Sequence, residues 1–226
     1  MDKSRIPTVL ISLLALLFFE APAQAGDLYA YNASTPVYEK PDSELPPLHM
    51  LSYGAKVTVA DEAMESGSEW IKGKIEAEAL CVVAYARSDA LLPLPAPDLS
   101  VSGFQSLINQ LEQVGAATSE RKDNVTTQTQ IFDHGVTLST RTFHTSYGDF
   151  EEQSLLVSDI TIAQGFLLAR AIVNQDGISS EQMRRVPIIE KDEQGHPFIF
   201  DETHWQIISV TQTQEGILIS FPERAD

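Results

Sequence analysis

The stretch Glu69-Trp70-Ile71-Lys72-Gly73-Lys74-Ile75 alternates between apolar and polar side chains after its tryptophan. Such alternation is typical of a short β-strand with one face in a core. The alternating segment Lys56-Val57-Thr58-Val59-Ala60 precedes it, and the polar loop Glu65-Ser66-Gly67-Ser68 lies between the two. Two strands joined by such a loop predict a hairpin, in which Trp70 is the largest apolar group.

The chain on both sides of this hairpin is also predicted to be β-structure. From Asp27 to Leu92, short apolar or alternating segments are separated by turn residues at intervals of about 8 to 12 positions, which is the spacing of a small barrel or sandwich. We therefore expect an all-β front domain over residues 26–92.

This segment resembles a bacterial SH3-like domain, and the resemblance covers residues 27–92. In the family's usual order come Val37-Tyr38, Tyr53-Gly54 before the valine strand Val57-Thr58-Val59, Trp70-Ile71-Lys72, and Ala84-Tyr85-Ala86-Arg87-Ser88 before Leu91-Leu92. The chain departs from the pattern at Ala84 and Ala86, where the family usually has Gly and Val.

The resemblance implies an all-β SH3-like barrel that acts as a binding or targeting module, often in cell-wall proteins. Peptidoglycan peptides and other envelope proteins are the ligand classes that it implies. Aromatic side chains offer large contact area at low entropic cost, so we expect Tyr29, Tyr53 and Tyr85 to line the binding surface. Trp70 is equally well interpreted as a ligand contact or as a packing residue.

The run Pro93-Leu94-Pro95-Ala96-Pro97 ends the β-rich segment. Proline cannot continue a helix or donate to a central strand, and alternating prolines favour an extended, semi-rigid spacer. We therefore predict a proline-rich linker over residues 93–98, followed by a second domain over residues 99–226.

The second domain is predicted to be α+β, and no family is identified for it. Apolar residues from Val101 to Val114 recur at three- and four-residue steps behind a capping box of Ser102 and Gln105, which predicts an N-terminal helix. Hairpins are expected around 133–135, 192–195 and 212–216, and a packed helix over 160–173 capped by Ser158 or Asp159.

Residues 1–25 are predicted to be a cleaved secretory signal peptide. Met1–Arg5 carries a net positive charge, residues 6–19 are almost wholly apolar, and Ala23-Gln24-Ala25 is a small-x-small cleavage site. A transmembrane anchor is the alternative, but about 20 residues are needed to span a bilayer. The cleavage point lacks a cysteine for lipid attachment. We therefore expect a periplasmic or secreted protein without stable membrane insertion.

The formal net charge is −17 at pH 7. This charge disfavours nucleic acid and anionic lipid as partners and favours basic ones, although solubility alone is the simpler explanation. Cys81 is the only cysteine, so no internal disulfide is expected. Its apolar neighbours predict that the thiol is buried.

No catalytic residue, cofactor or metal site is predicted. The histidines lack the spacing of a zinc site, and the chain has no G-x-S-x-G elbow, phosphate-binding glycine loop or EF-hand. Each histidine is expected to have a surface or capping role. The histidines are His49, His134, His144, His196 and His204.

Three functions are compatible with these observations. The first is a non-enzymatic envelope binding or adaptor protein that recognises peptidoglycan or a wall-associated protein through the front domain. The alternative is an acidic inhibitor or immunity-type protein for a basic cell-wall hydrolase, because opposite charge accelerates such encounters. A wall hydrolase with a site assembled in the second domain ranks last, since no nucleophile or metal set can be named. The oligomeric state is not predicted.

Overall fold

The computed structural model describes residues 26–59, 69–77, 80–101, 103–173, 189–191, 197–201 and 206–221. The predicted signal peptide, residues 1–25, lies outside the described residues. The fold consists mostly of antiparallel strands in two sheets, with few helices. In the part of the chain that is described, no helix has the length and hydrophobicity needed to cross a membrane.

The front sheet has seven antiparallel strands in the order β3-β2-β6-β5-β4-β1-β7. The predicted hairpin is present as β4 and β5, in which Val57 is opposite Ile75 and Thr58 is opposite Lys74. On its other side, β5 pairs with β6 from Trp70 opposite Arg87 to Ala77 opposite Leu80. The strands are Gly26–Ala30 (β1), Thr35–Tyr38 (β2), His49–Leu51 (β3), Lys56–Val59 (β4), Trp70–Ala77 (β5), Leu80–Arg87 (β6) and Leu91–Leu92 (β7).

The front sheet differs from the closed barrel that the family resemblance implies. Its edge strands are β3 and β7, and no pairing joins these two edges among the described residues. The prediction of antiparallel β-structure is confirmed, whereas the SH3-like assignment stays a prediction.

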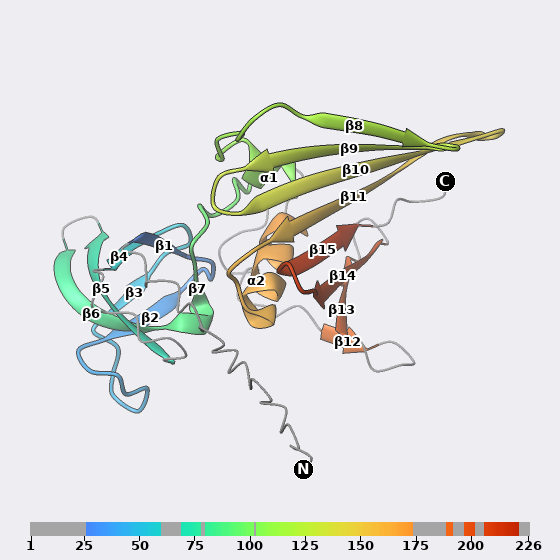
Figure 1. Cartoon of the computed structure of the whole chain (residues 1–226). Coiled ribbons are helices and arrows are strands. Elements are labelled where there is room, and N and C mark those ends of the chain that lie inside the picture. The colour runs from blue at the N-terminus through green and yellow to red at the C-terminus, as the bar shows by residue number, and fades with distance from the viewer. Residues whose placement is uncertain are drawn as a thin grey trace, which may run out of the picture.

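The second sheet has eight antiparallel strands in the order β12-β13-β14-β15-β11-β10-β9-β8. Strands β8 to β11 form an arm that extends away from the rest of the molecule (Figure 1). The predicted turn joins β9 to β10 through His134 and Gly135, whose φ angles of 54° and 68° suit a tight hairpin connection. The strands are Thr118–Lys122 (β8), Val125–Phe132 (β9), Val136–Thr145 (β10), Gly148–Val157 (β11), Ile189–Lys191 (β12), Pro197–Asp201 (β13), Gln206–Gln212 (β14) and Ile217–Phe221 (β15).

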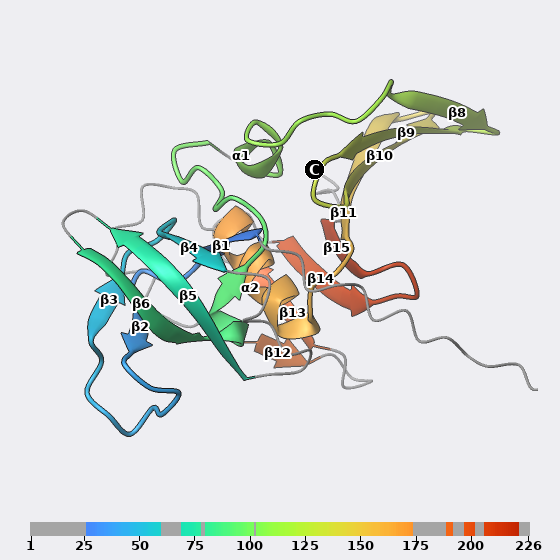
Figure 2. The ribbon, with the colours of Figure 1, turned by 60° about the vertical axis from the view of Figure 1, so that its left-hand side comes forward.

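The predicted packed helix is present as α2, Ile162–Val173. It begins with a capping box of Thr161 and Gln164 instead of at Ser158 or Asp159. The Thr161 backbone N donates to Gln164 Oε1 at 2.8 Å, and the Gln164 backbone N donates to Thr161 Oγ1 at 3.3 Å. Figures 1 and 2 both show α2 between the front sheet and strands β13 to β15.

The predicted N-terminal helix is much shorter than expected. Only Gln105–Ile108 (α1) is helical, although Leu107 is fully buried as the apolar pattern predicts. Ser102 lies outside the described residues. Beyond α1 the chain joins the second sheet, where the Val114 backbone N donates to the Ile131 oxygen at 2.7 Å. Long-range sheet pairing thus overrides the local helical periodicity.

Residues 93–98, which we call the strap, are packed into the core. Leu94 is fully buried in one hydrophobic cluster with Tyr31 of the front half and Leu168 of α2. Pro93, Pro95 and Pro97 have no backbone N–H, which halves the donors of this segment, and the Asp98 backbone N donates to the Ser106 oxygen at 3.0 Å. The Tyr31 hydroxyl donates to the Leu94 and Pro95 oxygens at 3.3 and 2.9 Å. Gln110 Nε2 donates to the Ala96 oxygen at 2.8 Å, and the Tyr53 hydroxyl donates to the Pro97 oxygen at 2.9 Å. The expectation of an extended spacer between separate cores is therefore wrong.

Two polar side chains of α2 also reach the front half. Gln164 Nε2 donates to the backbone oxygens of Ser88 and Leu91 at 3.3 and 2.7 Å. The guanidinium of Arg170, which is 8% exposed, donates to Asn32 Oδ1 at 2.6 Å. The boundary between the two halves, which we call the seam, is therefore held by hydrogen bonds as well as by apolar packing.

Cys81 is exposed, contrary to the prediction that it is buried. Alternation along β6 buries Ala84 and Ala86 on the core side and places Cys81, Val83 and Tyr85 on the other side. Apolar sequence neighbours therefore do not bury a residue in a strand whose second face meets solvent.

Candidate functional site

Trp70 and Tyr85, two of the four predicted binding residues, lie on the outer face of the β5–β6 hairpin. The residues that flank them in the chain, Ile71 and Ala86, are buried in the front core, so strand alternation turns both rings away from it. Trp70 is directly across from Arg87, and Tyr85 is directly across from Lys72. Both rings are half-buried and present part of their surface to solvent.

Tyr38 of β2 supports these rings from the neighbouring strand. It is directly across from Tyr85 in the β2–β6 pairing. Its ring meets that of Trp70 edge-on, with centroids 5.4 Å apart and an interplanar angle of 86°. Tyr38 is only 8% exposed, so it fixes the position of the indole. We call Tyr38, Trp70, Lys72, Tyr85 and Arg87 the aromatic face.

Two cations border the aromatic face. Lys72 Nζ lies 5.8 Å from the centroid of the Tyr85 ring, and Arg87 Cζ lies 6.0 Å from the ring of Trp70. Arg87 is held by Asp89, which accepts from Nε at 3.1 Å and from a terminal nitrogen at 2.9 Å. These hydrogen bonds raise the pKa of Arg87 above its ordinary value. The face can therefore offer ring surfaces and positive charge to one ligand.

Tyr29 and Tyr53 lie at the seam, away from the aromatic face. Both pack against the cluster that runs through the strap. The Tyr53 hydroxyl donates to the Pro97 oxygen at 2.9 Å, and burial raises the pKa of this hydroxyl. The structure thus brings together Trp70 and Tyr85 but places Tyr29 and Tyr53 in packing positions.

Sequence reasoning did not select Tyr38 as a site residue. Its neighbour Val37 is fully buried, and a local pattern does not show which strand lies next to β2. The pairing of β2 with β6 brings Tyr38 beside Tyr85 across 47 residues of chain. A long-range register of this kind has no signal in a single sequence.

A second polar cluster lies on the arm, where Thr126, His144 and Asp149 form a line. His144 Nδ1 lies 3.0 Å from Asp149 Oδ1, and His144 Nε2 lies 3.0 Å from Thr126 Oγ1. The order of groups is that of a nucleophile, a base and an orienting carboxylate. The His144–Asp149 pair could have been predicted from the sequence, because the tight turn before Gly148 places these two residues opposite each other.

Acyl transfer needs hydrogen-bond donors for the developing oxyanion as well as a nucleophile. Thr126 is the second residue of β9 and is paired on both sides, with Arg121 of β8 and Thr142 of β10. The backbone N of His144 is also occupied, because it donates to the Asn124 oxygen at 2.7 Å. We therefore interpret the line as a cross-strand hydrogen-bond network of the arm.

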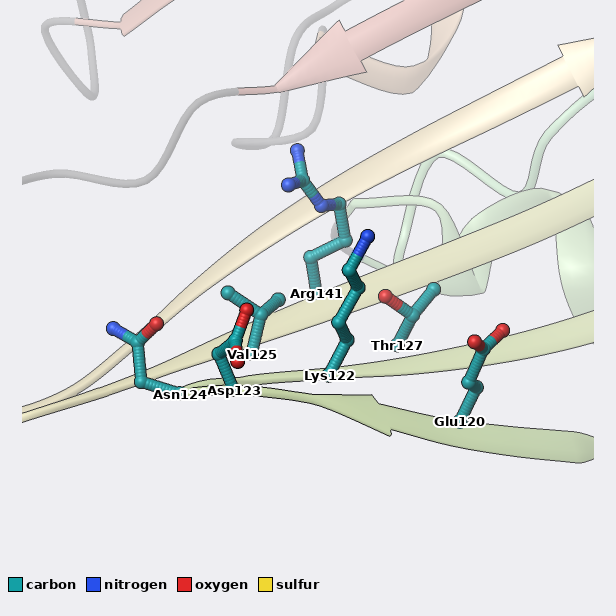
Figure 3. Close-up of a pocket in the computed structure, with 7 residues that line it drawn as sticks. All are labelled: Glu120, Lys122, Asp123, Asn124, Val125, Thr127 and Arg141. Atoms are coloured by element: carbon teal, nitrogen blue, oxygen red, sulfur yellow. The ribbon is translucent and has the colours of Figure 1, made fainter.

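A shallow hollow of about 270 Å³ opens on the arm at β8, β9 and β10 (Figure 3). Of its two cations, Lys122 and Arg141, the second already contacts Glu152 at 3.4 Å and lies 4.9 Å from the Phe143 ring. The lining mixes both signs of charge on exposed strands, so it does not present one complementary surface to a ligand. The lining residues are Glu120, Lys122, Asp123, Asn124, Val125, Thr127 and Arg141.

A scan against protein-family models found no match for the chain, and searches of curated proteins and of solved structures found none either.

Proposed function

We propose that this protein is an exported binding or adaptor protein of the cell envelope, without catalytic activity of its own. In this proposal the front half is an SH3-like module that recognises peptidoglycan or a wall-associated protein. The observation that carries the proposal is the aromatic face, on which Trp70 and Tyr85 share one exposed side with Lys72 and Arg87.

The chemistry of peptidoglycan suits such a face. Sugar rings and peptide methyl groups can pack on the half-exposed aromatic surfaces. Stem-peptide carboxylates can approach Lys72, which provides charge-assisted hydrogen bonds, whereas Arg87 is already paired with Asp89 and Glu69. A wall-associated protein with exposed acidic and apolar groups would satisfy the same requirements.

Sedimentation of residues 26–226 with purified sacculi tests the proposal. We expect the protein to pellet with sacculi, and Trp70→Ala and Tyr85→Ala to reduce the bound fraction several-fold. Tyr147→Ala is the matched control, because Tyr147 is 94% exposed at the end of the β10–β11 hairpin. Envelope extract passed over the same three variants tests a protein ligand.

Retention by neither sacculi nor extract would refute the proposal. Capture of a basic wall hydrolase, weakened sharply by salt, would instead favour the inhibitor function that the charge of −17 suggests. Degradation of peptidoglycan in a zymogram would contradict the absence of catalysis.

A further inference from the structure

The loop between β2 and β3 carries an unusual concentration of exposed apolar side chains. Residues 39–50 are exposed without interruption. Leu45 and Leu48 of the loop and Met50 of the adjoining strand β3 are 39%, 48% and 43% exposed, and they are three of the eight large hydrophobic residues that are exposed in the described part of the chain. Clusters of this kind are more often interaction sites than isolated exposed residues are.

The two prolines of the loop favour an extended shape for residues 45–47, which follow a turn at residues 43–44. Pro46 and Pro47 have their φ angles fixed near the polyproline II value, and the residue before each proline is driven to the extended region. No cis peptide bond occurs among the described residues. The ends of the segment are also tied, since the Leu48 backbone N donates to the Val37 oxygen at 2.7 Å and the Glu44 backbone N to Asp42 Oδ1 at 2.9 Å. A prolyl segment held in this way loses little entropy on binding.

Polyproline II segments bind to surfaces lined by aromatic rings, on which prolines and flanking apolar residues pack. The aromatic face of this chain has that composition. It begins at Tyr38, the last residue of β2, so the loop and the face are adjacent in the front sheet. Figures 1 and 2 show the loop projecting away from the second sheet, so it is accessible to another molecule.

Charge also matches the loop to the face. Four charged residues precede the prolines of the loop, of which Glu39, Asp42 and Glu44 are acidic and Lys40 is basic. On the aromatic face, Lys72 borders the Tyr85 ring, whereas Arg87 is already paired with Asp89 and Glu69. Lys72 is therefore the cation that faces the acidic loop. Two copies of a chain with a net charge of −17 repel each other at long range. A local pairing of acidic loop with cationic face opposes that repulsion.

We propose that the aromatic face binds the β2–β3 loop of a second copy of this chain. Because each copy has both surfaces side by side, two copies can exchange loops about a two-fold axis and form a closed dimer. The contact is small, so we expect a dissociation constant on the order of 10 μM. The proposal does not depend on wall binding, since self-association is measured without any wall component.

Sedimentation velocity of residues 26–226 at increasing concentration tests the dimer, with reductant present because Cys81 is exposed. We expect Leu45→Ser/Leu48→Ser to weaken dimerisation at least tenfold without affecting the core, since both side chains are exposed. Tyr147→Ser removes an exposed ring on the arm and should leave dimerisation unchanged.

A charge exchange between loop and face identifies the contact. Lys72→Glu and Glu44→Lys should each weaken dimerisation, because each places like charges together. An equal mixture of these two variants should dimerise about as well as the wild-type chain, because both contacts in the mixed dimer then join opposite charges. A chain that stays monomeric at all concentrations would overturn the proposal. So would a dimer that is insensitive to the loop and face variants, or variants whose mixture does not recover.

Discussion

Arg170 of α2 donates a hydrogen bond to Asn32 Oδ1 across the seam, at 2.6 Å. The guanidinium also donates to the backbone oxygen of Tyr31 at 3.4 Å, and its Nε has no hydrogen-bond partner. Burial lowers the pKa of Arg170, yet an arginine stays charged at neutral pH. A buried cation thus depends on neutral oxygen atoms from the other half of the chain.

We expect Asn32→Ala to lower the free energy of unfolding by about 1–3 kcal/mol, because it removes a charged hydrogen bond and leaves a buried donor unsatisfied. Chemical denaturation at pH 7 measures the change. Gln153→Ala, at an exposed position of β11, is the control and should stay within about 0.5 kcal/mol of wild type. Equal stability of the two variants would show that the bond across the seam contributes nothing.

Leu94→Ala should destabilise both halves together. The side chain is fully buried in the cluster that joins the strap, the front half and α2, and such truncations cost about 2–5 kcal/mol. In a Trp205→Phe background, in which Trp70 is the only tryptophan, fluorescence reports on the front sheet, while far-ultraviolet circular dichroism follows the whole chain. We expect the two signals to shift to the same new midpoint in Leu94→Ala. Separate midpoints for the two probes would contradict a shared core.

Stability should fall at alkaline pH because of Tyr31 and Tyr53. Burial raises the pKa of both hydroxyls above the ordinary tyrosine value of 10.0. The unfolded chain therefore loses these protons first, so their contribution is complete below about pH 10 and is lost as the pH rises above it. The slope is up to about 1.4 kcal/mol per pH unit for each group.

Denaturation of Tyr31→Phe/Tyr53→Phe between pH 9 and 11 checks this dependence. The double variant is expected to be less stable at pH 9, because strap carbonyls lose their donors, but to have a shallower decline with pH. Parallel declines in the variant and the wild-type chain would rule out these two tyrosines as the cause.

Gly73→Ala should destabilise the front sheet. A Cβ at this position would lie 2.4 Å from Val57 Cγ1 and 3.2 Å from the Thr58 oxygen of β4. Overpacking of this kind costs about 1–3 kcal/mol, and thermal unfolding measures it. Lys72→Ala, on the exposed side of the same strand, is the control and should change stability by less than about 0.5 kcal/mol. If Gly73→Ala had the stability of the wild-type chain, β4 would have to be able to shift away from the added methyl group.

Local patterns predicted those parts of the fold in which one periodicity persists. Alternation around Ile71 and Ile75 predicted the central hairpin, and the apolar steps around Leu168 predicted α2. The same reasoning failed for the chain after α1, because Val114 pairs with Ile131 and no local pattern encodes that partner.

The strap shows a similar limit. Its prolines correctly excluded helix and strand, but the burial of Leu94 depends on Tyr31 and α2, which are distant in sequence. For the candidate site, aromatic chemistry predicted Trp70 and Tyr85. The register of β2 against β6 was needed to add Tyr38 and to separate these rings from those at the seam.

Gln164 uses both ends of one side-chain amide. Its oxygen caps α2 at Thr161, and its nitrogen donates to the Leu91 oxygen in the front half. Formation of the first turn of α2 therefore orients the Gln164 amide that binds the front sheet. Helix formation, which is local, is in this way coupled to the attachment of the front sheet, which is long-range. A chain with glutamate here could still start the helix but would lack this fastening, so formation of α2 and attachment of the front half would become separable steps.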